Sequence, residues 1–190
     1  MSLTPSNMLP LGTPAPHFSL TDVVSQKTLS LEDFKGEKGL LVLFICRHCP
    51  YVVHVEKELA RVGRDYGPKG FDVIAISAND ADHYPDDRPE GLKEQALKAG
   101  FTFPYLYDEN QSVAKAFTAA CTPDIFLFDG THRLVYRGQI DDSRPGNGKP
   151  VTGKDLRDAL NALLNNTPVP QNQRPSTGCN IKWKSDRAIE

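Results

Sequence analysis

Two cysteines separated by two residues are the part of this chain best suited to chemistry. Cys46 and Cys49 enclose Arg47 and His48 and are followed directly by Pro50. A thiolate attacks disulfides, and two thiols at this spacing can close into a disulfide with each other. The pair therefore predicts a redox centre in which Cys46 attacks a substrate disulfide and Cys49 resolves the mixed disulfide.

The flanking sequence indicates which elements hold the two thiols. Residues 40–45 form an unbroken apolar run, typical of a strand that is buried on both faces of a parallel sheet. Beyond Pro50, apolar residues recur at the helical period, which predicts a helix: Val55, Leu59, Val62 and Tyr66. Unpaired N–H groups and the helix dipole favour a thiolate at such a strand-to-helix junction. We expect Cys46, at the mouth of the helix, to be the more exposed cysteine.

Arg47 and His48, between the cysteines, are expected to add positive charge beside the thiolate. A stabilised thiolate stabilises the reduced pair and makes it a stronger oxidant. The alternative is that these side chains are simply solvated. No acid lies within residues 40–45, so the proton acceptor for Cys49 is not identified. The candidates by proximity in sequence are Asp124, Glu56 and His54, and the alternative for each is a surface or structural residue.

Size and composition exclude several classes of protein. A chain of 190 residues with 39% hydrophobic and 24% charged residues is ordinary for one soluble globular domain. A net charge of −2 without a basic stripe argues against a nucleic-acid partner. No run approaches the roughly 20 apolar residues of a membrane span, and the first residues do not resemble a signal peptide. A cytoplasmic location is therefore the default expectation.

The order of predicted elements indicates the fold class. Apolar strands are expected at residues 40–46, 71–76 and 125–128, with a hairpin partner at 134–136; helices are expected at about 51–66, 89–99, 111–119 and 153–165. This order predicts an α/β protein with a mixed central sheet that contains a central parallel pair of strands and is covered by helices on both faces. The polar segment 79–90, which contains two prolines, is expected to be a surface loop. We divide the chain into a flexible arm (1–9), a domain (10–166) and a C-terminal tail that packs on it (167–190).

Further motifs carry a resemblance to a known superfamily. Thr122-Pro123 lies just ahead of a predicted strand, and together with the cysteine junction and the element order it resembles the thioredoxin-like superfamily. Gly12-x-Pro-x-Pro-x-Phe18-x-Leu20 is similar to the opening of AhpC/TSA-type redoxins. Cys46-x-His48-Cys49-Pro50-Tyr51 resembles an uncharacterised subgroup usually labelled thioredoxin-family or redoxin-domain proteins. The resemblance extends from about residue 10 to 184.

The resemblance implies a thioredoxin-like fold and thiol–disulfide oxidoreductase activity without a bound cofactor. The implied partners are a disulfide-containing protein or small thiol substrate and a second redox partner, with no nucleic acid and no membrane. It also implies that Pro123 is a cis-proline facing the cysteine pair and that Thr122 offers its backbone to a substrate peptide. Unlike thioredoxin, this chain has Ile45 rather than tryptophan before the first cysteine.

The remaining cysteines are candidate accessory thiols. Cys121, two residues ahead of Pro123, would lie near the site as a substrate-contacting or regulatory thiol, or would be a small packed residue. Cys179 would act as a second resolving thiol if the tail folds over the site, and would otherwise be a packed cysteine beside Trp183.

Two other functions remain open. Sco-type copper proteins resemble this chain in fold and use a cysteine pair with a distant histidine, but with three residues between the cysteines instead of two. A metallochaperone is therefore one alternative. Peroxiredoxins place Pro-x-x-x-Thr-x-x-Cys around the reactive cysteine; here Gly39 and Leu43 occupy the proline and threonine positions before Cys46. That difference disfavours the second alternative, a hydroperoxide reductase.

Overall fold

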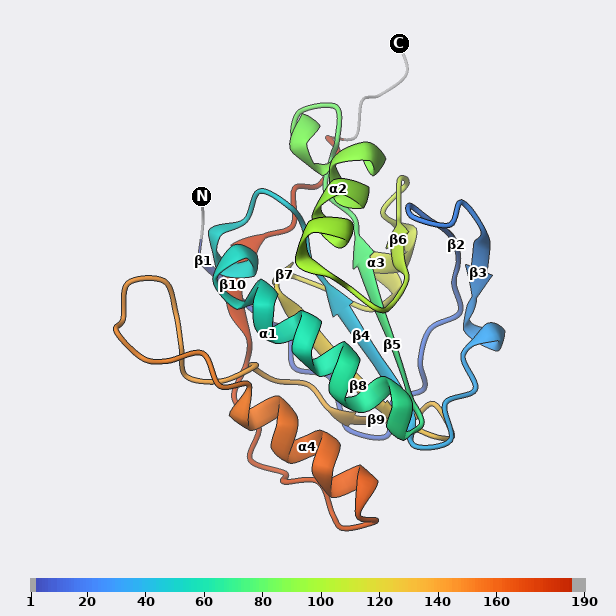
Figure 1. The fold of residues 1–190 in the computed structure, drawn as a ribbon, viewed down its shortest axis with the longest axis vertical. Coiled ribbons are helices and arrows are strands. Elements are labelled where there is room, and N and C mark those ends of the chain that lie inside the picture. Colours follow the sequence, from blue (N-terminus) through green and yellow to red (C-terminus); the bar gives the residue numbers. More distant parts are fainter. Residues whose placement is uncertain (1–2, 186–190) are drawn as a thin grey trace.

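A seven-stranded mixed sheet forms the centre of the computed structural model, which describes residues 3–185 (Figure 1). Its strand order is β3-β2-β6-β5-β4-β8-β9. The strands are β2 (Ser19–Asp22), β3 (Thr28–Ser30), β4 (Gly39–Phe44), β5 (Phe71–Ser77), β6 (Tyr105–Tyr107), β8 (Asp124–Asp129) and β9 (Leu134–Tyr136). β4, β5 and β6 run parallel, whereas β8 is antiparallel to both β4 and β9. The predicted central parallel pair and antiparallel hairpin are confirmed.

β4 explains why the cysteine pair follows so long an apolar run. All six of its residues are buried. Leu41 and Leu43 face one core, and Leu40, Val42 and Phe44 face the other. Since side chains alternate between the two faces of a strand, a strand covered on both sides must be apolar throughout.

Helices cover both faces, as predicted. They are α1 (Pro50–Tyr66), α2 (Pro89–Ala99), α3 (Ser112–Ala116) and α4 (Lys154–Leu164), with short 3-10 turns η1 (Leu31–Asp33), η2 (Gly67–Lys69) and η3 (Pro85–Asp87). Apolar residues of α1, α2 and α4 pack in one core, and those of α3 pack in the other. α3 is shorter than the predicted 111–119 because Gln111 and Thr118 have left-handed backbone conformations, with φ of 63° and 54°.

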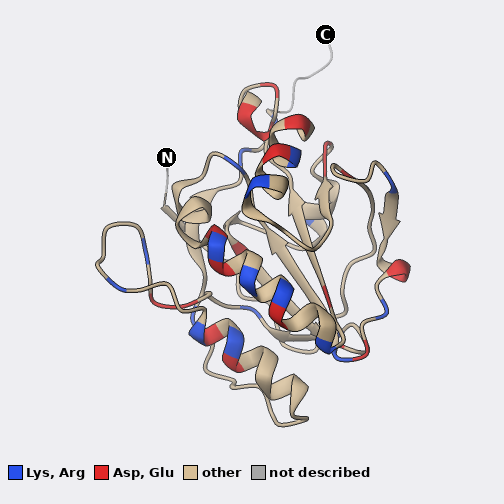
Figure 2. Cartoon of the chain, viewed as in Figure 1, with Lys and Arg blue, Asp and Glu red and all other residues tan. Residues whose placement is uncertain are grey.

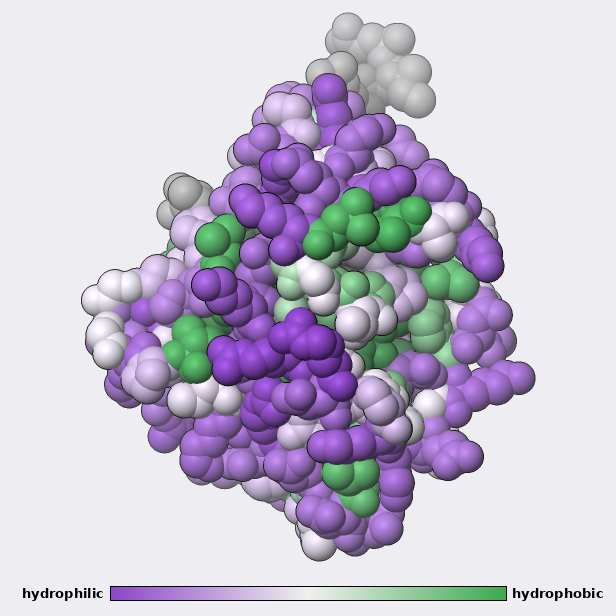
Figure 3. All heavy atoms as spheres, viewed as in Figure 1, coloured by the Kyte–Doolittle hydropathy of each residue, from purple (hydrophilic) through white to green (hydrophobic). Residues whose placement is uncertain are grey.

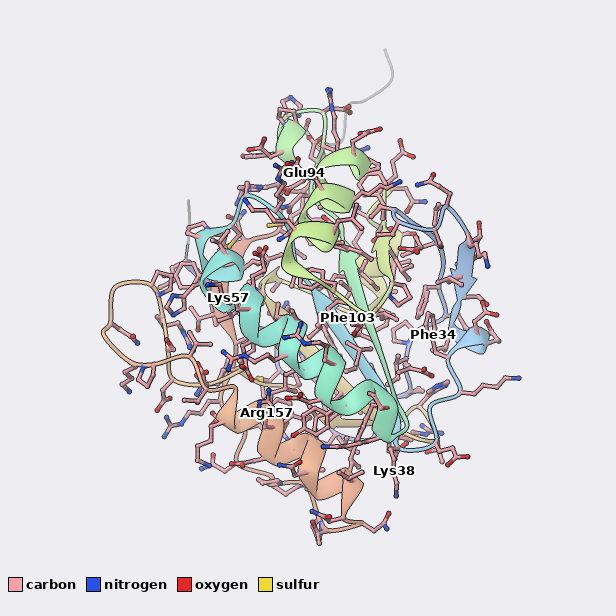
Figure 4. The ribbon with its side chains drawn as sticks, viewed as in Figure 1. Phe34, Lys38, Lys57, Glu94, Phe103 and Arg157 are labelled. Atoms are coloured by element: carbon pink, nitrogen blue, oxygen red, sulfur yellow. The ribbon has the colours of Figure 1, made fainter. Side chains whose placement is uncertain are left out.

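α4 is fixed to α1 by one arginine. Arg157 lies between the two helices (Figure 4), where its Nε donates to Glu58 at 2.5 Å and its Nη1 pairs with Asp65 at 2.9 Å. Glu58 is buried, so Arg157 supplies a counter-charge where water cannot. The outer face of α1 carries alternating basic and acidic residues (Figure 2). The middle and the last turn of α1 are therefore held from the α4 side as well as from the sheet.

The two ends of the described chain meet in a second, three-stranded sheet. β1 (Leu3–Pro5) pairs with β10 (Thr177–Asn180), and β10 pairs with β7 (Cys121–Thr122). The Ser6 amide also donates to the Ser176 carbonyl at 2.8 Å. The prediction of a flexible arm over residues 1–9 is therefore wrong for residues 3–6, which the tail strand holds in place. The prediction that the tail (167–190) packs on the domain applies to residues up to 185, because the last five lie outside the described residues.

The large hydrophobic side chains exposed among the described residues are Leu3, Met8, Leu11, Val53, Tyr84, Leu97 and Trp183. The face shown in Figure 3 is mostly hydrophilic, with hydrophobic residues exposed in small separate groups. Across residues 3–185, none of the helices combines the length and apolar character needed to cross a membrane.

Candidate active site

Cys46 and Cys49 lie where β4 leads into α1, so the predicted strand-to-helix junction is confirmed. The helix begins at Pro50, with Cys49 as its N-cap, so Cys46 precedes the helix instead of lying in its first turn. The two side chains are only 1% and 0% exposed. The expectation that Cys46 is the exposed member is therefore wrong: both thiols are enclosed in this form. All four cysteines of the chain are thiols.

Thr122 is the residue that connects the two sulphurs. The Thr122–Pro123 peptide bond is cis, in agreement with the implication of the resemblance. The Thr122 hydroxyl lies 3.4 Å from the Cys46 Sγ, and the Thr122 carbonyl oxygen lies 3.2 Å from the Cys49 Sγ. Thr122 thus presents its side chain to Cys46 and its backbone carbonyl to Cys49.

The backbone edge of β7 is occupied by the chain itself. Thr122 is the cross-strand partner of Cys179 on β10. The resemblance implies that Thr122 offers its backbone to a substrate peptide; in this structure the tail strand β10 pairs with one edge of that backbone. Figure 1 shows β10 and β1 beside the N-terminal end of α1.

The two thiols share one proton. The Cys46 thiol hydrogen-bonds to Cys49 and lowers the pKa of Cys49 to about 4; the Cys179 thiol and the Val52 amide assist, against burial. The same hydrogen bond raises the pKa of Cys46 well above its usual value, and burial and the Asp87 charge act in the same direction. The pair therefore carries one negative charge at neutral pH, on Cys49 in this arrangement.

Asp87 fixes the loop that holds the cysteines. This carboxylate has no exposed surface and accepts hydrogen bonds from the Arg47 amide at 2.8 Å and from the Asn79 side chain at 2.8 Å. It also bonds the His48 Nδ1 at 2.5 Å. Burial opposes the ionised carboxylate, but hydrogen bonds from His48 and Asn79 outweigh it and lower the pKa of Asp87. The loop conformation therefore depends on one buried anion.

His48 and Arg47 are each paired with a carboxylate. The hydrogen bond to Asp87 raises the pKa of His48 despite partial burial, and the imidazole stacks on Tyr84 with ring centroids 5.2 Å apart. The Arg47 guanidinium lies 2.9 Å from Glu94, which Figure 4 labels on α2. The predicted positive field beside the cysteines is therefore countered by two negative charges. Pro50 occupies the first helical position, where a missing N–H costs nothing.

The candidate proton acceptors for Cys49 have partners elsewhere. Asp124 pairs with Arg137 at 3.0 Å, and His54 bonds the Ser143 hydroxyl at 2.7 Å. Glu56 accepts from the Gln95 amide, which also donates to the Cys46 carbonyl at 3.3 Å. Each of the three candidates therefore has a partner other than Cys49, in agreement with the alternative that they are structural residues. The side chains hydrogen-bonded to its sulphur are Cys46, Thr122 and Cys179.

The two accessory cysteines differ in position. Cys121 is buried and its thiol lies 3.6 Å from the Pro123 carbonyl, while burial raises its pKa. This environment agrees with the alternative that Cys121 is a small packed residue. Cys179 lies on β10 and hydrogen-bonds to Cys49.

One group of side chains has the composition of a metal site. Ligand atoms of Cys46, His48 and Asp87 all lie within 4.8 Å of one another. Cys and His suit a soft or borderline metal such as Cu(I) or Zn(II). The Asp87 oxygens already accept hydrogen bonds from Arg47, His48 and Asn79, so this carboxylate would have to give up loop contacts to bind a cation.

Asp87 and Asn79 were not predicted as site residues because the polar segment 79–90 resembles a surface loop. Both are buried. The sequence did contain one indication that this loop lies near the cysteines. The strand before residues 79–90 and the strand before Cys46 were predicted to be parallel neighbours. The carboxyl ends of parallel strands meet at one edge of a sheet, so the two following loops lie together.

Comparison with known proteins identifies the fold. A crystal structure of an uncharacterized conserved protein from Geobacillus kaustophilus is 55% identical, with a TM-score of 0.96 over 97% of this chain and 98% of that chain. A hypothetical protein from Sinorhizobium meliloti 1021 is 49% identical, with a TM-score of 0.93 over 96% and 99%. A putative thioredoxin from Neisseria meningitidis is 26% identical, with a TM-score of 0.62 over 82% and 93%. The fold is thioredoxin-like.

Sequence comparison agrees with this assignment. The thiol-disulfide oxidoreductase ResA of Geobacillus kaustophilus (strain HTA426) is 26% identical over 130 residues, which cover 66% of this chain and 67% of that protein. The profile of the AhpC/TSA family matches residues 11–137. Since this match spans more than half of the chain and includes the cysteine junction and the cis-proline, the chain belongs to the AhpC/TSA family.

Proposed function

We propose that this protein is a thiol–disulfide oxidoreductase that works by dithiol–disulfide exchange through Cys46 and Cys49. The observation that carries the proposal is the position of both buried thiols at the β4–α1 junction, each within 3.4 Å of Thr122 and beside cis-Pro123. A dithiol in which one sulphur is already ionised at neutral pH is suited to attack disulfides. The similarity to ResA, a protein named as a thiol-disulfide oxidoreductase, supports the same class of reaction.

In the first step Cys46 forms a mixed disulfide with the substrate. Cys49 is covered by Cys179 and Thr122, whereas Cys46 is flanked by Arg47 and His48, whose side chains are partly exposed. The proton on Cys46 passes along the sulphur–sulphur hydrogen bond to Cys49, and the Cys46 thiolate displaces one substrate sulphur. That sulphur leaves as a thiolate and takes the proton back from Cys49.

In the second step Cys49 resolves the mixed disulfide. Its low pKa, about 4, keeps it ionised when it attacks the Cys46 sulphur. The Cys46–Cys49 disulfide forms, and the second substrate sulphur leaves as a thiolate. The substrate disulfide gains two electrons and the cysteine pair loses two, so the reaction is balanced.

Activity of cysteine variants tests the proposal. Reduction of a model protein disulfide with dithiothreitol as reductant is expected to be lost in Cys46→Ser. Cys49→Ser is expected to accumulate the mixed disulfide on Cys46, detectable by mass spectrometry. Cys121→Ser, a change at a packed thiol outside the pair, is the matched control and should retain activity. Unchanged activity in Cys46→Ser would refute the proposal. Replacing the disulfide by a hydroperoxide in the same assay tests the peroxidase alternative.

A metal-binding function is the second candidate, supported by the grouping of Cys46, His48 and Asp87. Its support is weaker because Asp87 is already used to hold the loop. Titration of the reduced protein with Cu(I) or Zn(II) separates the two functions. Tight binding of one equivalent that is lost in both Cys46→Ser and His48→Asn would favour metal binding.

A further inference from the structure

A third thiol, that of Cys179, packs against the Cys46–Cys49 pair. Cys179 is 130 positions from Cys49 in the sequence and only 3% exposed, and it packs in the same core cluster as Cys46 and Cys49. Its thiol hydrogen-bonds to Cys49. All three cysteines meet at Thr122: Cys46 at its hydroxyl, Cys49 at its carbonyl, and Cys179 as its cross-strand partner. The arrangement is a three-sulphur cluster with Cys49 in the middle.

The position of Cys179 is fixed by the strand that carries it. A Cβ at Gly178 would lie 2.0 Å from the Thr122 carbonyl oxygen, so β10 approaches β7 as closely as only glycine permits. On either side of the cysteine, the Ser176 hydroxyl donates to the Pro123 carbonyl at 2.6 Å and the Ile181 amide donates to the Ala120 carbonyl at 3.1 Å. Further along, the Lys182 amide donates to the Asn79 side chain at 2.8 Å. The tail strand is bonded on both sides to the loops that form the site.

We propose that Cys179 is a third redox-active thiol, which exchanges with the Cys46–Cys49 disulfide to form a Cys49–Cys179 disulfide. This inference rests on the proposed function, because the Cys46–Cys49 disulfide is its starting point. The Cys179 sulphur, as thiolate, attacks the Cys49 sulphur; the Cys49–Cys179 bond forms, the Cys46–Cys49 bond breaks, and Cys46 leaves as a thiolate. The proton released by Cys179 is available to Cys46. No electrons are gained or lost overall.

The exchange has a functional consequence. After the exchange, the disulfide joins Cys49 at the start of α1 to Cys179 on β10, and Cys46 is again a thiol. Cys46 could then meet a second sulphur partner while the centre remains oxidised. Cys121 cannot take this part from its present position, because its thiol is directed to the Pro123 carbonyl.

Disulfide mapping in Cys46→Ser tests the inference. The reduced variant is equilibrated with oxidised glutathione at low protein concentration, remaining thiols are alkylated at low pH, and peptides are identified by mass spectrometry without reduction. We expect an intramolecular Cys49–Cys179 disulfide, seen as loss of both cysteines from the alkylated pool. Cys46→Ser/Cys121→Ser should give the same product. A glutathione adduct on Cys49 with Cys179 fully alkylated would overturn the inference.

Wild-type protein separates failure of the inference from failure of the proposed function. If the unmodified chain forms no Cys46–Cys49 disulfide, the proposed function fails first. If it forms that disulfide but Cys46→Ser forms no Cys49–Cys179 bond, only the inference fails. Should Cys46→Ser not fold, partial oxidation of wild-type protein followed by rapid acid quenching replaces it. Peptides linked through Cys49 and Cys179 are then expected beside the Cys46–Cys49 product, and their absence refutes the exchange.

Discussion

Asp87 is the residue on which the geometry of the cysteine loop depends. Its carboxylate accepts the Arg47 and His48 amides and the His48 ring, and so fixes the two residues between the cysteines. The sequence motif predicted a contribution of charge from Arg47 and His48. The structure shows them mainly as parts of a loop held by a buried anion.

The His48–Asp87 pair predicts a pH dependence of stability. His48 has a raised pKa, so its contribution is complete below the usual value of 6.5 and is lost as pH rises through the raised value. Asp87 has a lowered pKa, so its contribution is complete above 3.8 and is lost as pH falls through the lowered value. The pair therefore stabilises most between pH 3.8 and 6.5.

His48→Gln is expected to reduce the free energy of unfolding inside this window by about 1 kcal/mol, and by less above the raised pKa of His48. Urea denaturation at several pH values measures both quantities. His54→Gln is the matched control, since His54 bonds a hydroxyl instead of a carboxylate. An equal effect of His48→Gln at all pH values would contradict the assigned ion pair.

The residue types of the site were predictable from the sequence, whereas their partners were not. Cys46, Cys49 and cis-Pro123 follow from spacing and resemblance. The burial of both thiols and the role of Asp87 depend on loops that meet only after the sheet has formed. No local pattern distinguishes a buried aspartate in a polar loop from the solvated ones beside it.

At the scale of elements, the three short strands β1, β7 and β10 decide what the cysteine pair can contact. They were not predicted, because none of them contains an apolar run and their pairing joins positions as far apart as Leu3 and Cys179. The long central elements were predicted because each has a continuous apolar run or a helical period. β10 covers the β7 edge, so the tail belongs to the site.

Gly178→Ala tests the contact between β10 and β7. The added Cβ would meet the Thr122 carbonyl, which cannot move without disturbing Pro123. We expect destabilisation of about 1–3 kcal/mol, as for overpacking, measured by thermal or urea denaturation. Gly67→Ala is the control, because a Cβ there meets nothing within 4 Å. Equal stability of both variants would show that β10 does not approach β7 this closely.

A buried ion pair holds the turn that carries the cis-proline. Arg137 and Asp124 are both fully buried, 3.0 Å apart, and the guanidinium also lies 3.8 Å above the Phe126 ring. Asp124 directly follows Pro123 and accepts the Ala120 amide at 2.9 Å. Burial raises the pKa of Asp124 despite the nearby Arg137 charge. The turn on the far side of the cysteine pair is therefore also built on a buried carboxylate.

Arg137→Met leaves Asp124 without its counter-charge and is expected to cost about 3–5 kcal/mol of stability. Adding Asp124→Asn should recover part of the loss, because no buried charge then remains unpaired. Denaturant titration of the single and double variants measures this. Arg133→Met, at an exposed arginine, should be close to neutral. A double variant less stable than Arg137→Met would contradict the explanation.

For the molecule as a whole, the fold class follows from the order and apolar character of its long elements. The mixed sheet with helices on both faces was predicted, and the likeness to solved structures of 55% and 49% identity shows the same fold over nearly the whole chain. Packing of the tail on the domain was also predicted, but the pairing of the tail with the first residues of the described chain was not. Residues from both ends of the described chain form one small sheet over the β4–α1 junction, and this places a third thiol against the cysteine pair.

The most direct test of the Cys46–Cys49 redox centre is the redox state of the cysteines in glutathione buffers. Wild-type protein is equilibrated over a range of reduced-to-oxidised glutathione ratios, trapped by alkylation and analysed by mass spectrometry. We expect a Cys46–Cys49 disulfide that forms and disappears as one two-electron couple. Its potential should lie above the roughly −270 mV of thioredoxin, because the single low-pKa thiolate stabilises the reduced form. If both cysteines remain alkylated as thiols at every ratio, the pair is not a redox centre and the account is wrong.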